Sequence, residues 1–169
     1  MSYKLEIFTD GACSGNPGPA GVGVVIKHNG ATIKEISRPI GQATNNIAEY
    51  TALIYALQEA LVLKADEVVV RSDSELMCHQ VGGVYKVKHQ NIKPLFERVR
   101  HLSAGFKHFR LEHVGREKNA AADQLSRRAI KKPPMASARG TDHICNSTAG
   151  QDGRPVAAGS GEESPSSKG

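Results

Sequence analysis

The order of strand-like and helix-like segments limits this chain to a sheet with helices packed against it. Short apolar segments bounded by turn residues predict three consecutive strands, at residues 3–10, 20–27 and 31–39. An Asn-Gly pair at residues 29–30 predicts a hairpin turn between the second and third of these strands. Because the connections are short, the three strands are expected to form an antiparallel meander.

The rest of the pattern alternates helices with strands. Apolar residues at helical spacing predict a long helix over residues 47–63, and a continuously apolar segment at 67–71 predicts a strand inside a sheet. The later segments predict two helices, a strand and a last helix, at residues 74–81, 91–102, 106–114 and 117–130. The predicted order is βββαβααβα, which describes an α/β fold with a mixed sheet.

Composition divides the chain near Lys132. Residues 1–132 have the mixture of apolar and charged residues that one globular domain needs. Residues 133–169 are rich in Gly, Ser, Ala and Pro and hold few large apolar residues. Such a segment cannot bury enough surface to offset its ordering entropy, so we predict a disordered C-terminal tail. A linker is the alternative interpretation.

Charge is spread unevenly over the domain. The whole chain has a net charge of +5, and residues 71–132 alone hold 14 basic and 6 acidic residues. A basic half favours a polyanionic partner such as nucleic acid, although a merely soluble cationic surface is the alternative. No apolar segment approaches the roughly 20 residues that cross a bilayer, so no membrane association is expected. The cysteines show no disulfide or zinc-binding spacing, which favours a reducing, cytoplasmic setting.

Four acidic residues stand where predicted strands end or within predicted helices. Asp10 ends the first predicted strand, Asp73 follows the fourth, and Glu49 and Asp123 lie in the first long helix and the last helix. Taken singly, each has a plainer interpretation: Asp10 as a turn residue, Glu49 and Asp73 as capping residues, and Asp123 as a solvated helix residue. Jointly, Asp10 and Asp73 would meet beyond the carboxyl ends of neighbouring strands, where open sheets bind ligands. Clustered carboxylates repel one another, and a divalent cation such as Mg²⁺ or Mn²⁺ removes that cost.

Each of these acids lies in a block that resembles type 1 ribonucleases H. The blocks, which follow the order of the family, are TDGACSGNPGPAGVGVVI (Thr9–Ile26), TNNIAEYTALIYAL (Thr44–Leu57), VVVRSDSELMCHQV (Val68–Val81) and HVGREKNAAADQLS (His113–Ser126). The resemblance covers residues 1–132. It implies a ribonuclease H-like fold with a five-stranded mixed sheet, an antiparallel second strand and helices on both faces.

The resemblance also implies an activity. Type 1 ribonucleases H are endonucleases that cut the RNA strand of an RNA–DNA hybrid and leave 5′-phosphate and 3′-hydroxyl ends. By resemblance, Asp10, Glu49, Asp73 and Asp123 are the catalytic acids and hold two Mg²⁺ ions, with Asp10 bridging them. Mn²⁺ is expected to substitute. The enzyme is expected to be monomeric.

Two segments match substrate-contacting positions of the family. In a loop expected at residues 11–16, Gly11 lets the backbone approach the substrate closely. The matching positions in this loop are Cys13, Ser14 and Asn16, which by resemblance contact the RNA strand.

The second segment precedes the first long helix. Asn45 and Asn46 resemble a pair that reads 2′-hydroxyls in the minor groove, which is how a protein distinguishes RNA from DNA. Thr44 resembles a residue that holds a DNA phosphate. Helix capping is an alternative role for the Asn pair.

Two features depart from the family pattern. Many members carry a mobile His, assigned to product release, on a loop before the last acid, but here that loop is short. Spacing to Asp123 favours His113 for this role, whereas alignment of the preceding strand favours Arg116. We favour Arg116, because short-loop members often have Arg there and a lone strand His is more often structural.

The tryptophan-rich basic protrusion of some bacterial members is also absent, since the chain has no Trp. In the segment that remains, Tyr85, Lys86 and Lys88 are predicted to grip the DNA strand by stacking and phosphate contact. A solvated connector is the alternative. Two other functions stay open, an inactive nucleic-acid-binding module of the same fold and another nuclease of the same superfamily.

Overall fold

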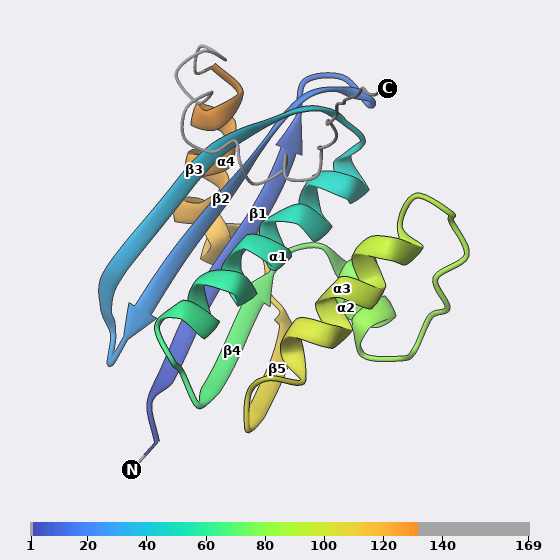
Figure 1. Ribbon diagram of the computed structural model, residues 1–169. Coiled ribbons are helices and arrows are strands. Elements are labelled where there is room, and N and C mark those ends of the chain that lie inside the picture. Colours follow the sequence, from blue (N-terminus) through green and yellow to red (C-terminus); the bar gives the residue numbers. More distant parts are fainter. Residues whose placement is uncertain (1, 132–169) are drawn as a thin grey trace, which may run out of the picture. The chain divides into compact units, whose positions relative to one another are not determined.

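The sheet has five strands in the order β3-β2-β1-β4-β5 (Figure 1). The computed structural model describes residues 2–131, so the tail predicted at 133–169 lies outside the described residues. The strands are β1 (Lys4–Cys13), β2 (Gly18–His28), β3 (Ala31–Ala43), β4 (Glu67–Ser72) and β5 (His108–His113). β2 is antiparallel to β1 and β3, whereas β4 and β5 run parallel to β1. The predicted meander and mixed five-stranded sheet are confirmed.

Helices cover both faces of this sheet. They are α1 (Asn45–Val62), α2 (Glu75–Val81), α3 (Lys93–Ser103) and α4 (Ala120–Lys131), the last preceded by a short 3₁₀ turn, η1 (Arg116–Asn119). α1 lies across one face with α3 beside it, and α4 lies against β1, β2 and β3 on the other (Figure 1). The order βββαβααβα and the α/β fold class are therefore confirmed. Within residues 2–131, no helix is long and apolar enough to cross a membrane.

The main core lies between α1 and the sheet. Alternate residues of β1, Leu5 and Ile7, point into it and are fully buried, as are Val68 and Val70 of β4. The helical spacing of α1 places Tyr50, Leu53 and Leu57 against them, also fully buried. Burying side chains of this size supplies about 1.5–3 kcal/mol each, so this layer fixes α1 on the sheet.

β1 is longer than the sequence predicts. Asp10 does not end the strand, and Gly11 to Cys13 are strand residues rather than loop, so both expectations are wrong. The reason is the hairpin partner, because β1 pairs with β2 as far as Cys13↔Ala20. The parallel ladder with β4 nevertheless stops at Thr9↔Ser72, which makes Asp10 the first β1 residue beyond β4.

The last helix also begins differently from the prediction. Residues 117–119 belong to η1, and the α-helix starts at Ala120, which places Asp123 in its first turn rather than in its interior. The buried side chain of Asn119 explains the break, because its Nδ2 donates to the carbonyl oxygen of Thr9 at 2.9 Å. This contact ties the start of α4 to β1, next to Asp10.

Two glycines let the helices approach the sheet backbone. A Cβ on Gly11 would lie 2.2 Å from the carbonyl carbon of Ala48 in α1. A Cβ on Gly23 would lie 2.2 Å from the carbonyl oxygen of Ala122 in α4. Neither neighbour is a flexible side chain, so both contacts require glycine.

We therefore expect Gly11→Ala to push α1 away from β1 and lower the free energy of unfolding by about 1–3 kcal/mol. Denaturant unfolding followed by circular dichroism measures this. Gly82→Ala is the control, because Gly82 has right-handed helical angles and its added methyl meets one backbone oxygen at 3.1 Å. An unchanged midpoint in Gly11→Ala would contradict this close approach.

Candidate active site

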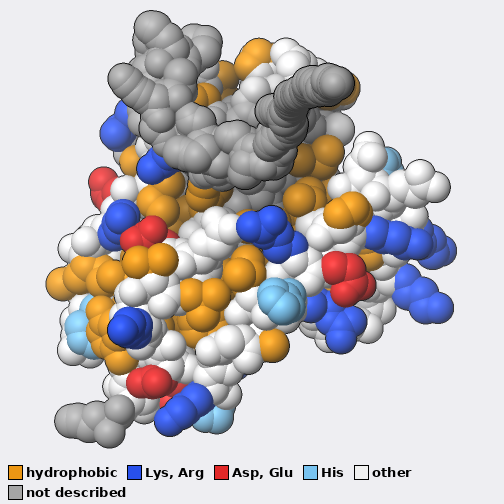
Figure 2. Space-filling model, in the orientation of Figure 1, with side chains coloured by type: hydrophobic (Ala, Val, Ile, Leu, Met, Phe, Trp, Pro, Cys, Tyr) orange, Lys and Arg blue, Asp and Glu red, His pale blue; other side chains and the backbone are white. Residues whose placement is uncertain are grey.

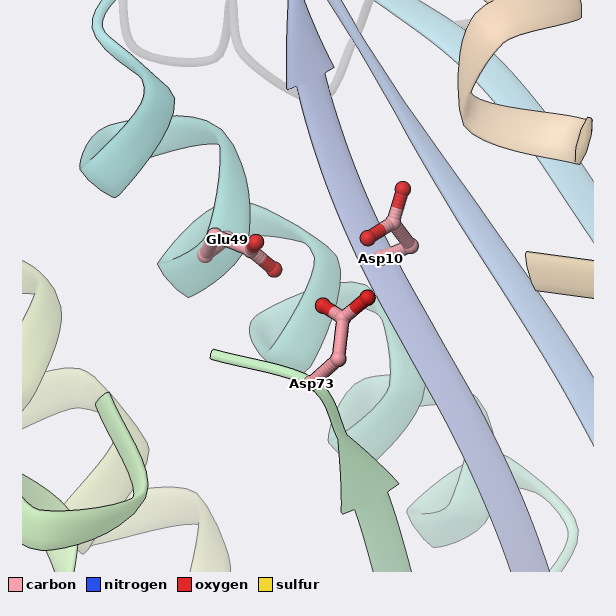
Figure 3. A group of neighbouring side chains, drawn as sticks. All are labelled: Asp10, Glu49 and Asp73. Carbon is pink, nitrogen blue, oxygen red and sulfur yellow. The ribbon is translucent and has the colours of Figure 1, made fainter. Parts of the chain in front are cut away.

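Three acidic side chains from three elements converge at one end of the sheet. Asp10 of β1, Glu49 of α1 and Asp73, just after β4, each offer a carboxylate oxygen, and these oxygens lie within 4.8 Å of one another (Figure 3). Asp10 is 4% exposed and Glu49 is 5% exposed. The sequence predicts this convergence, although the three residues are far apart in the chain.

Backbone geometry explains the arrangement. Because the β1–β4 ladder ends at Thr9↔Ser72, the next residue of each strand, Asp10 and Asp73, follows the same parallel pair. Glu49 reaches them from the first turns of α1, where its Oε1 accepts a hydrogen bond from the Gly11 backbone N–H at 3.2 Å. The parallel pair and the close α1 contact therefore bring the three carboxylates together.

Glu49 and Asp73 are not the capping residues of their helices. The side chain of Thr44 caps α1 by accepting from the Ile47 N–H, and Ser74 caps α2 by accepting from the Met77 N–H. The plainer capping interpretation of both acids is therefore wrong. Neither carboxylate is used in capping, and both belong to the acidic cluster with Asp10.

The fourth predicted acid, Asp123, lies beside this group rather than in it. It lines the same pocket as Asp10 and Glu49, about 440 Å³ in volume. Its carboxylate is held by Arg127, whose Nε lies 3.2 Å from Oδ1 and 3.1 Å from Oδ2. The structure thus gathers three of the four acids and places the fourth at the wall of the same pocket.

Burial and mutual repulsion perturb the acids. The pKa of Asp10 is raised from 3.8 to about 7, mainly by burial and further by the charges of Asp73 and Asp123. The Ser126 hydroxyl, which donates to Oδ2 at 2.6 Å, partly opposes this rise. Burial, followed by the charges of Asp10 and Asp73, raises the pKa of Glu49 well above its ordinary value. Without a counter-charge, the cluster is therefore costly to ionise.

The donor set fits a divalent cation. The ligands on offer are carboxylate oxygens, which hard cations such as Mg²⁺, Mn²⁺ and Ca²⁺ prefer. Oδ2 of Asp73 is buried and has no hydrogen-bond partner, and the nearest basic group is Arg116, with its Nε at 3.7 Å. A buried anionic oxygen without a donor is the atom that a bound cation would satisfy. Asp10, Glu49 and Asp73 can therefore hold a divalent metal ion.

Comparison with known proteins identifies the family. A family model described as reverse transcriptase-like matches residues 8–129. A solved RNase H1 from Halobacterium salinarum is 38% identical, with a TM-score of 0.74, and the match covers 75% of this chain and 97% of that one. The chain belongs to the ribonuclease H family.

Two further relatives are similar over most of this chain. LC11-RNase H1, solved in complex with an RNA/DNA hybrid, is 47% identical with a TM-score of 0.70, over 75% of this chain and 96% of that chain. A bifunctional protein of Mycobacterium tuberculosis is 38% identical over 141 residues, which are 82% of this chain. The chain matches only 39% of the length of that mycobacterial protein.

The residues that resemble substrate contacts of ribonucleases H line two pockets. Gly11, Cys13, Ser14 and Asn45 line the pocket of the acids. A second pocket, about 390 Å³ in volume, is lined by Asn16, Thr44, Asn45, Asn46, Ile47, His89, Asn91 and Ile92. Asn45 lines both pockets, and its backbone N–H donates to Asn16 Oδ1 at 3.0 Å. The turn after β1 and the start of α1 are therefore held together beside the acids.

The structure separates the two candidates for the family's mobile His. Arg116, in η1, lines the pocket of the acids, whereas His113 is the last residue of β5 and pairs with Ser72. This placement agrees with the strand-based alignment that favours Arg116.

The three predicted DNA-gripping residues lie outside both pockets. Tyr85, Lys86 and Lys88 are exposed on the loop after α2, and the Tyr85 ring packs against His79 at 4.7 Å between centroids. Figure 2 shows basic side chains gathered at the edge of the molecule where this loop lies. Their role stays a prediction.

Sequence reasoning did not single out some pocket residues. Arg127 and Lys131 of α4 line the pocket of the acids, and His89 and Asn91 line the second pocket. The position of Arg127 four residues after Asp123 is a recognisable signal, because residues at that spacing share a helix face. His89 and Asn91 carry no such local signal, since a connecting loop brings them to α1.

We expect Asp10→Asn to stabilise the metal-free protein at pH 8. A raised pKa means that the folded state binds the proton more tightly than the unfolded chain does. Proton binding by Asp10 therefore contributes to folding stability below about pH 3.8, and this stabilisation is lost as pH rises through about 7. Because a tenfold change in proton affinity is worth about 1.4 kcal/mol, the variant should gain about 1–4 kcal/mol at pH 8.

Denaturant unfolding in EDTA at pH 5 and pH 8 tests this expectation, and the gain should shrink at the lower pH. Glu35→Gln removes an exposed carboxylate of β3 and should give no such gain. Equal stability of Asp10→Asn and the unsubstituted protein at pH 8 would show that ionising Asp10 does not destabilise the folded state.

Proposed function

We propose that this chain is an endonuclease that hydrolyses the RNA strand of RNA–DNA hybrids and leaves 5′-phosphate and 3′-hydroxyl ends. The observation that carries the proposal is the convergence of Asp10, Glu49 and Asp73 within 4.8 Å beside a pocket lined by the family's substrate positions. The hybrid-bound state of the 47% identical LC11-RNase H1 supports the choice of substrate.

Two Mg²⁺ ions, or Mn²⁺ in their place, are the proposed cofactors. Asp10, Glu49, Asp73 and Asp123 would hold them. Bound there, the ions would supply an activated water and a counter-charge for the leaving 3′-oxygen. Glu49 would keep its orientation through the Gly11 N–H, and Ser126 would orient Asp10 through its Oδ2.

Arg116 is proposed to act on the substrate phosphate. Its side chain is 73% exposed and lines the pocket of the acids, with its Nε 3.7 Å from Asp73. A guanidinium in this position can attract a phosphate oxygen while staying mobile enough to release it. Arg116 therefore fits the role that the mobile His has in other members.

The second pocket is proposed to hold the backbones of the hybrid. Thr44 presents its hydroxyl at the N-terminus of α1, where backbone N–H groups and the helix dipole favour a phosphate. The side-chain amides of Asn45 and Asn46 can exchange hydrogen bonds with 2′-hydroxyls, which DNA lacks. The RNA strand would then pass the acids and the two asparagines, and the DNA strand would pass Thr44.

A monomeric state and a cytoplasmic setting stay predictions from the sequence. The monomer follows from the resemblance to type 1 ribonucleases H, and the setting follows from cysteines without a disulfide pattern. Sedimentation of the full chain and localisation of a tagged chain would test them.

The proposed activity predicts selective cleavage. With Mg²⁺ or Mn²⁺, the protein should cut an RNA–DNA hybrid faster than RNA–RNA or DNA–DNA duplexes of the same sequence, and EDTA should stop it. Gel analysis of end-labelled strands measures this, and an exonuclease that needs a 5′-phosphate should degrade the downstream products. Glu49→Gln and Asp73→Asn should abolish cleavage while keeping the native circular dichroism spectrum.

Other outcomes would support the alternative functions. Comparable cleavage of the DNA duplex would favour another nuclease of the superfamily. Binding of the hybrid without cleavage in either metal would favour an inactive nucleic-acid-binding module.

The loop after α2 predicts a salt-dependent contribution to binding. If Lys86 and Lys88 contact DNA phosphates, the double Ala variant should bind the hybrid more weakly, and its log–log salt slope should be shallower by about 1–2. Fluorescence anisotropy in EDTA at several salt concentrations measures both quantities.

Lys107→Ala is the control for this experiment, because that exposed lysine precedes β5 at the opposite end of the sheet from the acids. An unchanged slope in the double variant would leave residues 86 and 88 as a solvated connector.

A further inference from the structure

Arg127 engages both oxygens of an acid that the proposed function needs for metal binding. Its Nε lies 3.2 Å from Oδ1 and 3.1 Å from Oδ2 of Asp123, one helical turn earlier in α4. Both side chains line the pocket of the acids. In this arrangement both oxygens that a cation would use lie within 3.2 Å of one guanidinium nitrogen.

Among the described residues, Asp123 differs in this respect from the other three acids. The nearest basic group to Asp73 is Arg116 at 3.7 Å, beyond hydrogen-bond distance. Asp10 and Glu49 accept hydrogen bonds from uncharged donors, the Ser126 hydroxyl and the Gly11 N–H. Asp123, which is not one of the three mutually close carboxylates, is thus the acid of the four with an arginine nitrogen within hydrogen-bond distance.

We propose that Arg127 is an internal counter-ion that competes with divalent cations for Asp123, so that the second cation binds only as the guanidinium withdraws. The inference rests on the proposed metal-dependent function. Arg127 would act as a positioning residue that sets the affinity of the site for its ions. No contact between Arg127 and the substrate is needed.

The solvent exposure of Arg127 and Asp123 sets the expected strength of this competition. The side chains of Arg127 and Asp123 are 62% and 23% exposed, and exposed ion pairs one helical turn apart are weak. The arginine should therefore weaken cation binding without preventing it. Because exposed charges are screened by salt, the effect should be larger at low ionic strength.

The test is a titration of the metal-free full chain with Mn²⁺, without substrate, in which electron paramagnetic resonance measures the free ion. We expect Arg127→Ala to tighten the weaker Mn²⁺ site by about two- to fivefold at low salt, with a smaller gain in 0.5 M salt. Arg127→Lys, which keeps the charge but loses the planar fork, should lie between the two.

Arg128→Ala is the matched control. Arg128 is the next residue of α4, is exposed and does not line the pocket, so its removal changes the net charge equally. The affinity of the Arg128→Ala variant for Mn²⁺ should stay close to that of the unsubstituted protein. An equal gain in both variants would overturn the proposal, because overall charge would then explain the effect.

A double-mutant cycle makes the test specific to the pair. In an Asp123→Asn background, Arg127→Ala should no longer change Mn²⁺ affinity, since the acid for which the two cations compete is gone. A persistent gain in that background, or unchanged affinity in Arg127→Ala alone, would overturn the proposal.

This experiment also separates the inference from the proposed function. If the unsubstituted protein binds Mn²⁺ and cuts the hybrid while Arg127→Ala binds Mn²⁺ unchanged, only the counter-ion role fails. If the unsubstituted protein binds no Mn²⁺, the metal-dependent function and the counter-ion role fail together.

Discussion

The parallel pairing of β1 with β4 is the constraint on which the site depends. Its last pair, Thr9↔Ser72, is followed on each strand by an aspartate, so the ladder that stabilises the sheet delivers two carboxylates to one place. α1 adds the buried Glu49. Burial and like charges raise the pKa of Asp10 to about 7, a cost that the apolar layer between α1 and the sheet must offset. A bound cation would relieve the same cost, which links metal affinity to stability.

Close backbone contacts on both faces of the sheet set the dimensions of the site. Gly11 admits the backbone of α1, and Gly23 admits that of α4. Acids therefore approach β1 from both sides, Glu49 from one helix and Asp123 from the other. The two approaches differ in chemistry. Glu49 is buried and held by a backbone N–H, whereas Asp123 lies at the pocket wall with an arginine. The acid on one side is thus buried, whereas the acid on the other side is partly exposed.

The residues that line the second pocket are harder to predict from local sequence than the acids are. Thr44, Asn45 and Asn46 could be predicted because they begin a helix with a recognisable pattern, and the structure places them together with Asn16. His89 and Asn91 line the same pocket but come from an irregular connection after α2. No hydrophobic period describes such a connection, so its path depends on how α3 packs against α1.

The sequence by itself determined the element order and the sheet's meander, because hydrophobic period and turn residues are local properties. It pointed to the acids through the four blocks that resemble type 1 ribonucleases H. It did not determine that β1 continues to Cys13, since that extension depends on hydrogen bonds to β2. Nor did it determine that η1 delays α4 until Ala120, because the responsible contact joins Asn119 to Thr9 across the fold. The Arg127–Asp123 pair follows from a spacing of four residues within α4, whereas the raised pKa values belong to the tertiary structure. Burial and side-chain direction arise only when segments distant in the chain pack together.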